Sequence, residues 1–285
     1  MANLDLRPLS LGEILDRTFS LYRGNFLLFA GIAAIPQLLV LCLNLVTTAV
    51  PAVSPTPGGN LRLPSAGIMA LGFVPLLIGI VIYVVAYLFA QGGTVFAVSE
   101  LYLGRNTTII ASLKRMRGHF WTLLGVIILN GIAVGAATLL LIIPGIWLAC
   151  RLVVCVPAAL LEDLGPSESL SRSFRITEDY AGRSFLIYLL YFVLNYAATL
   201  LLMFPFTFAA GLSARNPEMA RLWLVMSHFG QFVATVVVTP ILTIATAVFY
   251  YDLRVRREAF DLQVMLNSLG GGLPGAAPAT PSQAS

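Results

Sequence analysis

Residues 120–161 read FWTLLGVIILNGIAVGAATLLLIIPGIWLACRLVVCVPAALL, a stretch in which Arg151 is the single charged residue. A helix needs about 20 consecutive apolar residues to cross the hydrocarbon core of a bilayer. This stretch is therefore long enough for two membrane-spanning helices, with Pro144 and Gly145 between them. Its apolar residues are continuous rather than alternating, which favours helices over the strands of a membrane barrel.

The same pattern recurs along the whole chain of 285 residues. Hydrophobic residues make up 58% and charged residues 11% of the sequence, whereas soluble domains have roughly 45–50% and about 25%. The sequence therefore predicts an all-α, polytopic integral membrane protein with one transmembrane domain over 1–265. Its predicted spans are the six apolar runs near 26–50, 68–98, 120–143, 146–161, 185–212 and 222–250.

Three segments depart from this pattern. The run near 146–161 is the shortest, and we expect it to be tilted or to lie partly in the interface. Residues 51–66, PAVSPTPGGNLRLPSA, are rich in Pro and Gly and predict an external loop. Residues 266–285 form a tail whose composition predicts disorder.

Basic residues fall almost entirely on alternate connecting segments. The less basic side holds Arg62, Arg215 and Arg221. Because cytoplasmic loops carry the excess of Lys and Arg, this asymmetry predicts that both termini lie in the cytoplasm. The net charge of +4 then reflects loops that face anionic lipid headgroups, and no nucleic-acid partner is expected. The more basic side holds Arg7, Arg17, Arg23, Arg105, Lys114, Arg115, Arg117, Arg172, Arg175, Arg183, Arg254, Arg256 and Arg257.

Three of these basic segments, 10–23, 107–118 and 167–181, have apolar residues at helical spacing. Ser10 and Glu13 have the spacing of a capping box. Ser167 is the candidate N-cap of the third segment. Short amphipathic helices with basic polar faces lie in the headgroup plane, so we expect interfacial helices here. In the third, the residues predicted to line one side are Leu170, Phe174 and Tyr180.

Each predicted interfacial helix leads into two spans, which indicates a unit repeated three times. The second and third units align best: FWTLLGVIILN at 120–130 matches FLIYLLYFVLN at 185–195, and AATLLL follows in both. The third span also contains Gly131 and Gly135 as a GxxxG pair, which allows close helix contact. We expect this pair to pack within the bundle rather than at a dimer interface.

Four strings resemble a bacterial family named the glycerophosphoryl diester phosphodiesterase membrane domain. They are LRPLSLGEILDRTFSLYRGNF at 6–26, IPGIWLACRL at 143–152, EDLGPSESLSRSFRIT at 162–177 and FYYDLRVRREAFDL at 249–262. The resemblance implies a stand-alone membrane module of the bacterial cytoplasmic (inner) membrane. Some members of the family are fused to a phosphodiesterase domain, but no catalytic or ligand residues are established for the membrane module itself. The resemblance therefore implies no phosphodiesterase activity for this chain.

The residues give little support for catalysis. General acid–base chemistry needs titratable groups within hydrogen-bond reach of one another, and no acid lies in the middle of a run. The chain has two histidines, His119 and His228, which the topology places toward opposite membrane faces. Its three cysteines match no metal or haem spacing. We therefore expect no enzymatic activity, no metal and no cofactor.

Two candidate sites remain. Arg151 lies about six residues into the fourth run, roughly 9 Å below its outer boundary at 1.5 Å per residue. His228 lies at a similar depth in the sixth run. The pair could hold the phosphate of an outer-leaflet lipid. Alternatively, Arg151 extends to the outer headgroups while His228 makes a hydrogen bond between helices.

The second candidate site is a charge cluster at the cytoplasmic ends of the runs, formed by Glu162, Asp163, Arg172, Arg175, Asp252, Arg254 and Arg256. One interpretation is that Glu162 and Asp252 pair with the arginines and fix the interfacial helices to the bundle. The other is that they form separate surface pairs, each worth under about 1 kcal/mol.

Two functions follow from these patterns. The first is a non-enzymatic membrane module that binds lipids or organises other membrane proteins. The second is a small transporter, for which the support is the polar residues inside the runs, such as Gln37, Gln91 and Asn130. A water-filled cavity lined by these amides would favour transport, whereas a groove open to lipid would favour the first function.

Overall fold

The computed structural model describes residues 8–49, 66–213 and 215–258. Every regular element within these ranges is a helix, which confirms the predicted all-α class. The predicted external loop, apart from Ala66, and the predicted C-terminal tail lie outside the described residues.

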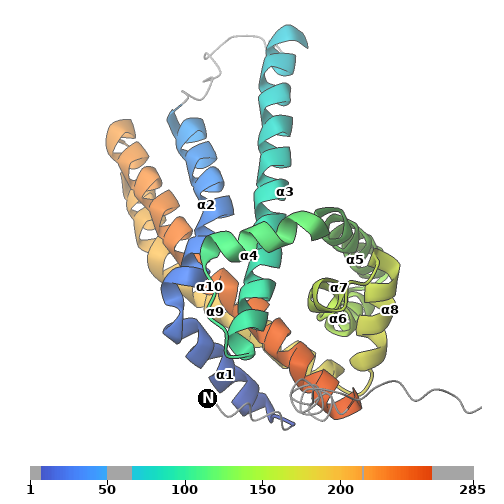
Figure 1. Ribbon diagram of the computed structural model, residues 1–285. Coiled ribbons are helices and arrows are strands. Elements are labelled where there is room, and N and C mark those ends of the chain that lie inside the picture. The colour runs from blue at the N-terminus through green and yellow to red at the C-terminus, as the bar shows by residue number, and fades with distance from the viewer. Residues whose placement is uncertain (1–7, 50–65, 214, 259–285) are drawn as a thin grey trace, which may run out of the picture.

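Ten α-helices and one short 3₁₀ helix make up the described part of the chain (Figure 1). They are α1 (Leu11–Gly24), α2 (Phe26–Ala49), α3 (Ala66–Tyr102), α4 (Ile109–Met116), η1 (Arg117–His119), α5 (Phe120–Leu140), α6 (Ile142–Arg151), α7 (Cys155–Leu161), α8 (Pro166–Ile176), α9 (Ala181–Leu212) and α10 (Pro217–Glu258).

Six segments within the described residues are long and apolar enough to cross a membrane, as the sequence predicted. They are Phe26–Thr48, Leu77–Tyr102, Ile109–Leu140, Ile142–Leu161, Ala181–Leu212 and Pro217–Arg257. The fourth segment is not one continuous helix. It begins in α6, which ends at Arg151, and resumes in α7 at Cys155, with a turn between them. This break places Arg151 at a helix terminus rather than within a straight span.

Helix α10 is the central element of the bundle, because it contacts α1, α2, α3, α7, α8 and α9. Figure 1 shows α2, α9 and α10 close together, with α5 to α8 grouped to one side. Residues 243–253 of α10 are buried without interruption. A helix segment that is buried on all sides in this way lies at the centre of a helical protein.

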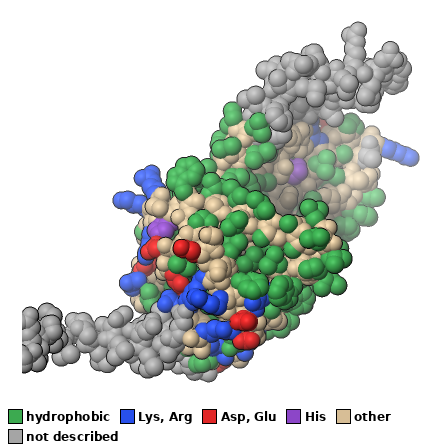
Figure 2. All heavy atoms as spheres, turned by 90° about the vertical axis from the view of Figure 1, so that its right-hand side faces the viewer, with side chains coloured by type: hydrophobic (Ala, Val, Ile, Leu, Met, Phe, Trp, Pro, Cys, Tyr) green, Lys and Arg blue, Asp and Glu red, His purple; other side chains and the backbone are tan. Residues whose placement is uncertain are grey.

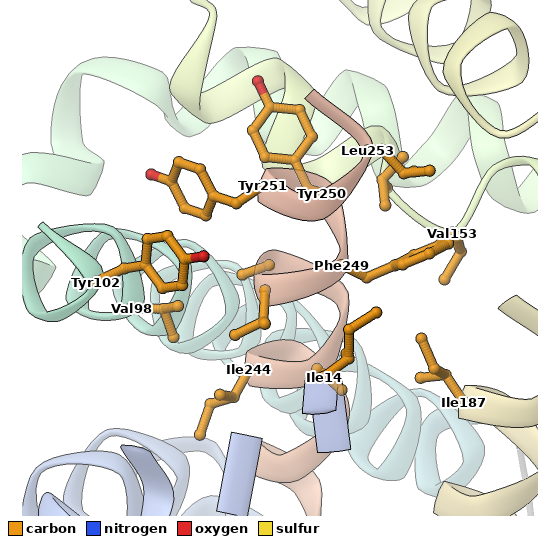
Figure 3. Close-up of a cluster of buried hydrophobic side chains, with 14 of the residues drawn as sticks. Ile14, Val98, Tyr102, Val153, Ile187, Ile244, Phe249, Tyr250, Tyr251 and Leu253 are labelled. Atoms are coloured by element: carbon orange, nitrogen blue, oxygen red, sulfur yellow. The ribbon is translucent and has the colours of Figure 1, made fainter. Parts of the chain in front are cut away.

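The largest buried cluster surrounds the C-terminal half of α10 (Figure 3). Tyr251 stacks on Tyr102 of α3, with ring centroids 4.7 Å apart, and its hydroxyl donates a hydrogen bond of 2.9 Å to Ser99 Oγ. Ile14 brings α1 into the same cluster, and Val153 brings in the turn between α6 and α7. This cluster therefore joins segments from all three predicted units.

Helix α1 begins as the sequence predicted. The backbone N–H of Glu13 donates to Ser10 Oγ at 3.3 Å, and the N–H of Ser10 donates to Glu13 Oε2 at 2.6 Å, which forms the capping box. Ile14, Thr18 and Tyr22 are buried on one face of the helix. The amphipathic pattern therefore packs α1 against the bundle through this face.

Helix α8 differs from the prediction in its start and in its buried face. The N-cap is Gly165 rather than Ser167, because Pro166 occupies the first helical position and Glu168 Oε2 accepts the Gly165 N–H at 3.1 Å. The buried residues of α8 are Ser169, Ser173 and Ile176. Of the predicted face, Phe174 is 37% exposed and Tyr180 follows the end of the helix.

The order of helices follows the predicted units: a short amphipathic helix precedes α2 and α3, another precedes α5 and the α6–α7 pair, and a third precedes α9 and α10. The ends of α3, α7 and α10 and the start of α9 carry most of the described ion pairs. We call this region the charged end. Figure 2 shows most of the visible charged side chains at one end, where Asp and Glu lie among Lys and Arg, and hydrophobic side chains over much of the remaining visible face.

Candidate functional site

Glu162, directly after α7, is the centre of one ion-pair network at the charged end. Arg172 of α8 donates from Nε to Glu162 Oε2 at 2.9 Å and from Nη2 to Oε1 at 2.9 Å, which is a bidentate pair. Tyr250 Oη donates to Oε1 at 2.6 Å, and Arg254 Nε lies 3.9 Å from the same oxygen. Burial alone would raise the pKa of Glu162. The hydrogen bonds from Arg172 and Tyr250 and the charges of Arg172 and Arg254 outweigh it, so this pKa is lowered.

Asp252 of α10 is the centre of a second network. Its carboxylate has no exposed surface and accepts a hydrogen bond of 2.7 Å from the backbone N–H of Leu9. Arg256 Nε donates to Oδ2 at 2.9 Å, and Arg183 Nη1 of α9 lies 3.6 Å from Oδ2. Arg183 and Arg256 also donate to the carbonyl of Leu9. This network fixes the segment before α1 to α9 and α10.

The predicted charge cluster is therefore divided between two networks and is incomplete. Glu162 pairs with Arg172 and Arg254, whereas Asp252 pairs with Arg256 and with Arg183, which the predicted cluster did not include. Arg175 forms no ion pair within the described part of the chain and is exposed on α8. Its side chain lines a groove on the surface of α8.

Arg151, at the end of α6, is buried and has only 5% of its surface exposed. Its Cζ lies 4.0 Å from the centre of the Phe174 ring on α8 and 5.5 Å from the centre of the Trp147 ring. Its Nε is buried and has no hydrogen-bond partner. Ser173 of α8 and Thr177, directly after α8, donate to the backbone carbonyl of Arg151 at 2.9 and 2.8 Å.

These contacts correct the predicted environment of Arg151. The sequence placed it near the outer boundary, whereas the structure packs it against α8, which the sequence places on the cytoplasmic side. The predicted depth holds only for a straight, continuous span. Helix α6 ends at Arg151 instead, and α8 packs against this end of the helix.

His228 has different partners from Arg151, so the predicted pair does not form a joint site. His228 Nε2 lies 3.0 Å from Thr48 Oγ1 of α2, and its Nδ1 is buried without a hydrogen-bond partner. Arg221 Nε donates to the carbonyl of Thr48 at 3.0 Å. The contact between His228 and Thr48 joins α10 to α2, which agrees with the alternative interpretation of a hydrogen bond between helices.

A groove of about 470 Å³ opens beside Arg151 between α5, α6 and α8. Its polar lining consists of Arg151, Ser171, Arg175 and Glu178. Its remaining lining is apolar and consists of Ala133, Leu148, Leu152, Leu170 and Phe174. We call it the Arg151 groove.

A second groove, of about 670 Å³, lies between α5, α6 and α9, and its lining is mostly apolar. We call it the α5–α9 groove. Gly131 and Gly135 line it, and a Cβ added at either glycine would have nothing within 4 Å. The expectation that this GxxxG pair packs within the bundle is therefore wrong. Asn130 also lines the groove, and its buried Oδ1 has no hydrogen-bond partner.

The polar residues of α2, α3 and α10 surround a smaller cavity of about 20 Å³. Gln37 and Gln91 line it, together with Thr94, Thr239 and Thr243. Thr243 donates to Gln91 Oε1 at 2.9 Å, and Gln91 Nε2 donates to the Tyr87 hydroxyl at 2.8 Å. A cavity of this volume has room for about one water molecule.

The fold and these sites define a polytopic, α-helical integral membrane protein with grooves between its spans. No family model, curated protein or solved structure matches this chain. Among the described residues, no group of three or more His, Cys, Asp or Glu side chains is placed to hold a metal ion.

Proposed function

We propose that this chain is a non-enzymatic membrane module that binds membrane lipid laterally between its helices. The observation that carries the proposal is the α5–α9 groove. It is lined by helices that are apolar enough to span a membrane, and its glycine floor is unoccupied by any neighbouring helix. Acyl chains surround such helices in a bilayer, so they are the available occupant of an apolar groove of this volume.

The carboxylates at the centres of the two networks, partly buried Glu162 and fully buried Asp252, support a structural rather than a catalytic role. Glu162 and Asp252 are both held by arginines and by hydrogen bonds that join helices far apart in the sequence. Such pairs hold the interfacial helices against the spans. We therefore propose that the module presents α1 and α8 at a fixed position on the membrane surface, where other membrane proteins can also bind.

The orientation and the family are part of the same proposal. The basic residues of the charged end support cytoplasmic termini in a bacterial inner membrane by the positive-inside rule. The four strings around Ser10, Arg151, Arg172 and Asp252 support membership of the glycerophosphoryl diester phosphodiesterase membrane domain family. All four strings lie at or next to the contacts that join α1, α6, α8 and α10.

A small transporter is the alternative. Its support is the polar cavity around Gln37 and Gln91, but a volume of about 20 Å³ gives no room for a solute larger than about one water molecule. The lipid-accessible grooves are much larger, at about 470 and 670 Å³. Their size favours lateral lipid binding over transport.

The test is photo-crosslinking of the purified full chain in vesicles that contain a phosphatidylcholine with a photoactivatable acyl chain. We expect crosslinks at residues of the α5–α9 groove, mapped by mass spectrometry. The double variant Gly131→Leu/Gly135→Leu fills the groove and should reduce them. Gly211→Leu, on α9 but outside the groove lining, is the matched control, because a Cβ there also meets nothing within 4 Å. Crosslinks spread evenly over all spans, or unchanged by the double variant, would contradict the proposal.

A further inference from the structure

Arg151 carries a charge that the described protein leaves without a counter-ion. An arginine guanidinium stays protonated in proteins, and burial of an unpaired charge is costly. Arg151 is 5% exposed, its Nε has no hydrogen-bond partner, and no carboxylate of the described residues forms an ion pair with it. The Phe174 ring at 4.0 Å provides a cation–π contact, but a ring face does not neutralise the charge.

The other charges of the Arg151 groove favour an anion. Phe174 and Arg175 of α8 lie three and four residues after Ser171, so all three share one face of the helix, and Glu178 lies in the turn that follows α8. Arg151 and Arg175 contribute two positive charges to the groove, and Glu178 contributes one negative charge. The groove therefore has a net positive charge, and neither of its two arginines forms an ion pair with a described residue.

The apolar part of the groove favours a lipid as the source of this anion. Ala133 of α5 and Leu148 of α6 line the groove beside Arg151, and both belong to segments that can span a membrane. Trp147 is half-exposed and packs against Phe174 with ring centroids 5.7 Å apart. Tryptophan is enriched where the hydrocarbon of a bilayer meets its headgroups. A phosphate between the arginines would thus have its acyl chains beside α5 and α6.

From these observations we propose that the Arg151 groove binds the phosphate of an anionic phospholipid, with Arg151 and Arg175 as its two cationic contacts. This inference rests on the proposed lipid-binding function and adds the chemical class of the lipid. Arginine suits the role because its planar fork can donate two parallel hydrogen bonds to phosphate oxygens. Ser171 supplies a hydroxyl donor on the same face of α8.

The test is competition for a fluorescent phosphatidylglycerol bound to the purified full chain in detergent. The competitors are unlabelled phosphatidylglycerol, phosphatidylcholine with the same acyl chains, and soluble glycerol phosphate. We expect phosphatidylglycerol to compete about tenfold better than phosphatidylcholine, because the choline of phosphatidylcholine brings a positive charge beside the two arginines. Soluble glycerol phosphate should not compete, because it lacks acyl chains. Competition by glycerol phosphate at the same concentration as the lipid would overturn the assignment to a lipid.

Variants of the two arginines locate the site. Arg175→Gln removes an exposed charge, so the fold should be unaffected, and we expect it to abolish the preference for phosphatidylglycerol. Arg151→Gln should do the same and retains the backbone carbonyl that accepts from Ser173 and Thr177. Arg151→Lys should recover only part of the preference, because an ammonium lacks the planar fork. Arg117→Gln, an exposed charge outside the groove, is the matched control and should leave the preference intact.

The two proposals fail in different ways. If Arg175→Gln and Arg117→Gln keep the same preference, or if neither lipid is preferred, the anionic site is wrong. Crosslinking of neutral lipid in the α5–α9 groove would then still support the general function. If that crosslinking also fails, the lipid-binding function itself is wrong.

Discussion

The backbone N–H of Leu9 donates a hydrogen bond of 2.7 Å to Oδ1 of Asp252, a residue 243 positions later in the chain. The same carboxylate accepts from Arg256 and lies 3.6 Å from Arg183. Because it has no exposed surface, these partners replace the water that an aspartate normally binds. The start of α1, the start of α9 and the end of α10 therefore meet at one buried charge.

Asp252→Asn should destabilise the protein strongly. The substitution leaves Arg183 and Arg256 without their carboxylate, and removal of one partner from a buried pair costs about 3–5 kcal/mol. We expect a lower thermal unfolding midpoint and faster tryptic cleavage at Arg17 of α1, both measured on protein in detergent. Asp179→Asn is the control. Asp179 pairs with Arg257 but is 75% exposed, so its loss should cost under about 1 kcal/mol. Equal effects of the two variants would show that the Asp252 network does not hold α1.

The loss caused by reversing the charge of Arg172 should be rescued by charge reversal at Glu162 and not by charge reversal at Asp252. Arg172→Glu places a second carboxylate beside Glu162 and should lower the yield of folded protein. Adding Glu162→Arg restores an opposite pair, but the rescue should be partial because Tyr250 and Arg254 also contact Glu162. Adding Asp252→Arg should give no rescue, since Asp252 belongs to the other network. The measurement is monodisperse yield after gel filtration, and rescue by Asp252→Arg would contradict the observed pairing.

The contribution of Glu162 to the stability of the folded protein should disappear at low pH. Its folded pKa lies below the usual value, so the ionised form is favoured by folding and stabilises the protein at pH values above the unfolded pKa of about 4.3. This stability is lost as the pH falls through the lowered folded pKa. We therefore expect Glu162→Gln to have a lower unfolding midpoint than the parent chain at pH 6, and the difference to shrink below about pH 4. A difference that stays constant from pH 6 to pH 3.5 would contradict this assignment.

The class of fold was predictable because it depends on local composition. Long runs without charge have few alternatives to membrane-spanning helices, and the Ser10–Glu13 capping box acts within one turn. The start of α8 was assigned two residues late, although Pro166 at the first helical position was a usable signal. Ser167 competes with this signal, because serine is a common N-cap residue.

The partners of charged residues were less predictable, because they depend on how the helices pack. The sequence indicated that Glu162 and Asp252 would meet arginines, but not which ones. The contact of Arg151 with α8 depends on the break after α6, and no single residue of the turn signals it. No feature of the sequence predicts that Asp252 is buried. Its partner Leu9 binds it through a backbone N–H, which nearly every residue carries, so the pairing leaves no mark in the sequence.

Close helix packing in this bundle depends on a glycine that the sequence motif did not identify. A Cβ added at Gly230 of α10 would lie 2.0 Å from the backbone carbonyl oxygen of Leu202 on α9. A backbone atom cannot move aside as a flexible side chain can, so the two helices would have to separate. Gly131 of the GxxxG pair has open space instead.

Gly230→Ala should therefore lower the thermal unfolding midpoint in detergent, by an amount that corresponds to about 1–3 kcal/mol or more for overpacking. Gly131→Ala should be neutral or stabilising, since alanine favours a helix by up to about 1 kcal/mol over glycine and nothing opposes its methyl group. The two variants make the same chemical change in membrane-spanning helices, so their difference isolates the contact with α9. If Gly131→Ala proved the more destabilising variant, Gly131 would have to pack against another helix in the membrane, such as one from a second copy of the chain. The α5–α9 groove would then be an interface between protein chains rather than a site for lipid.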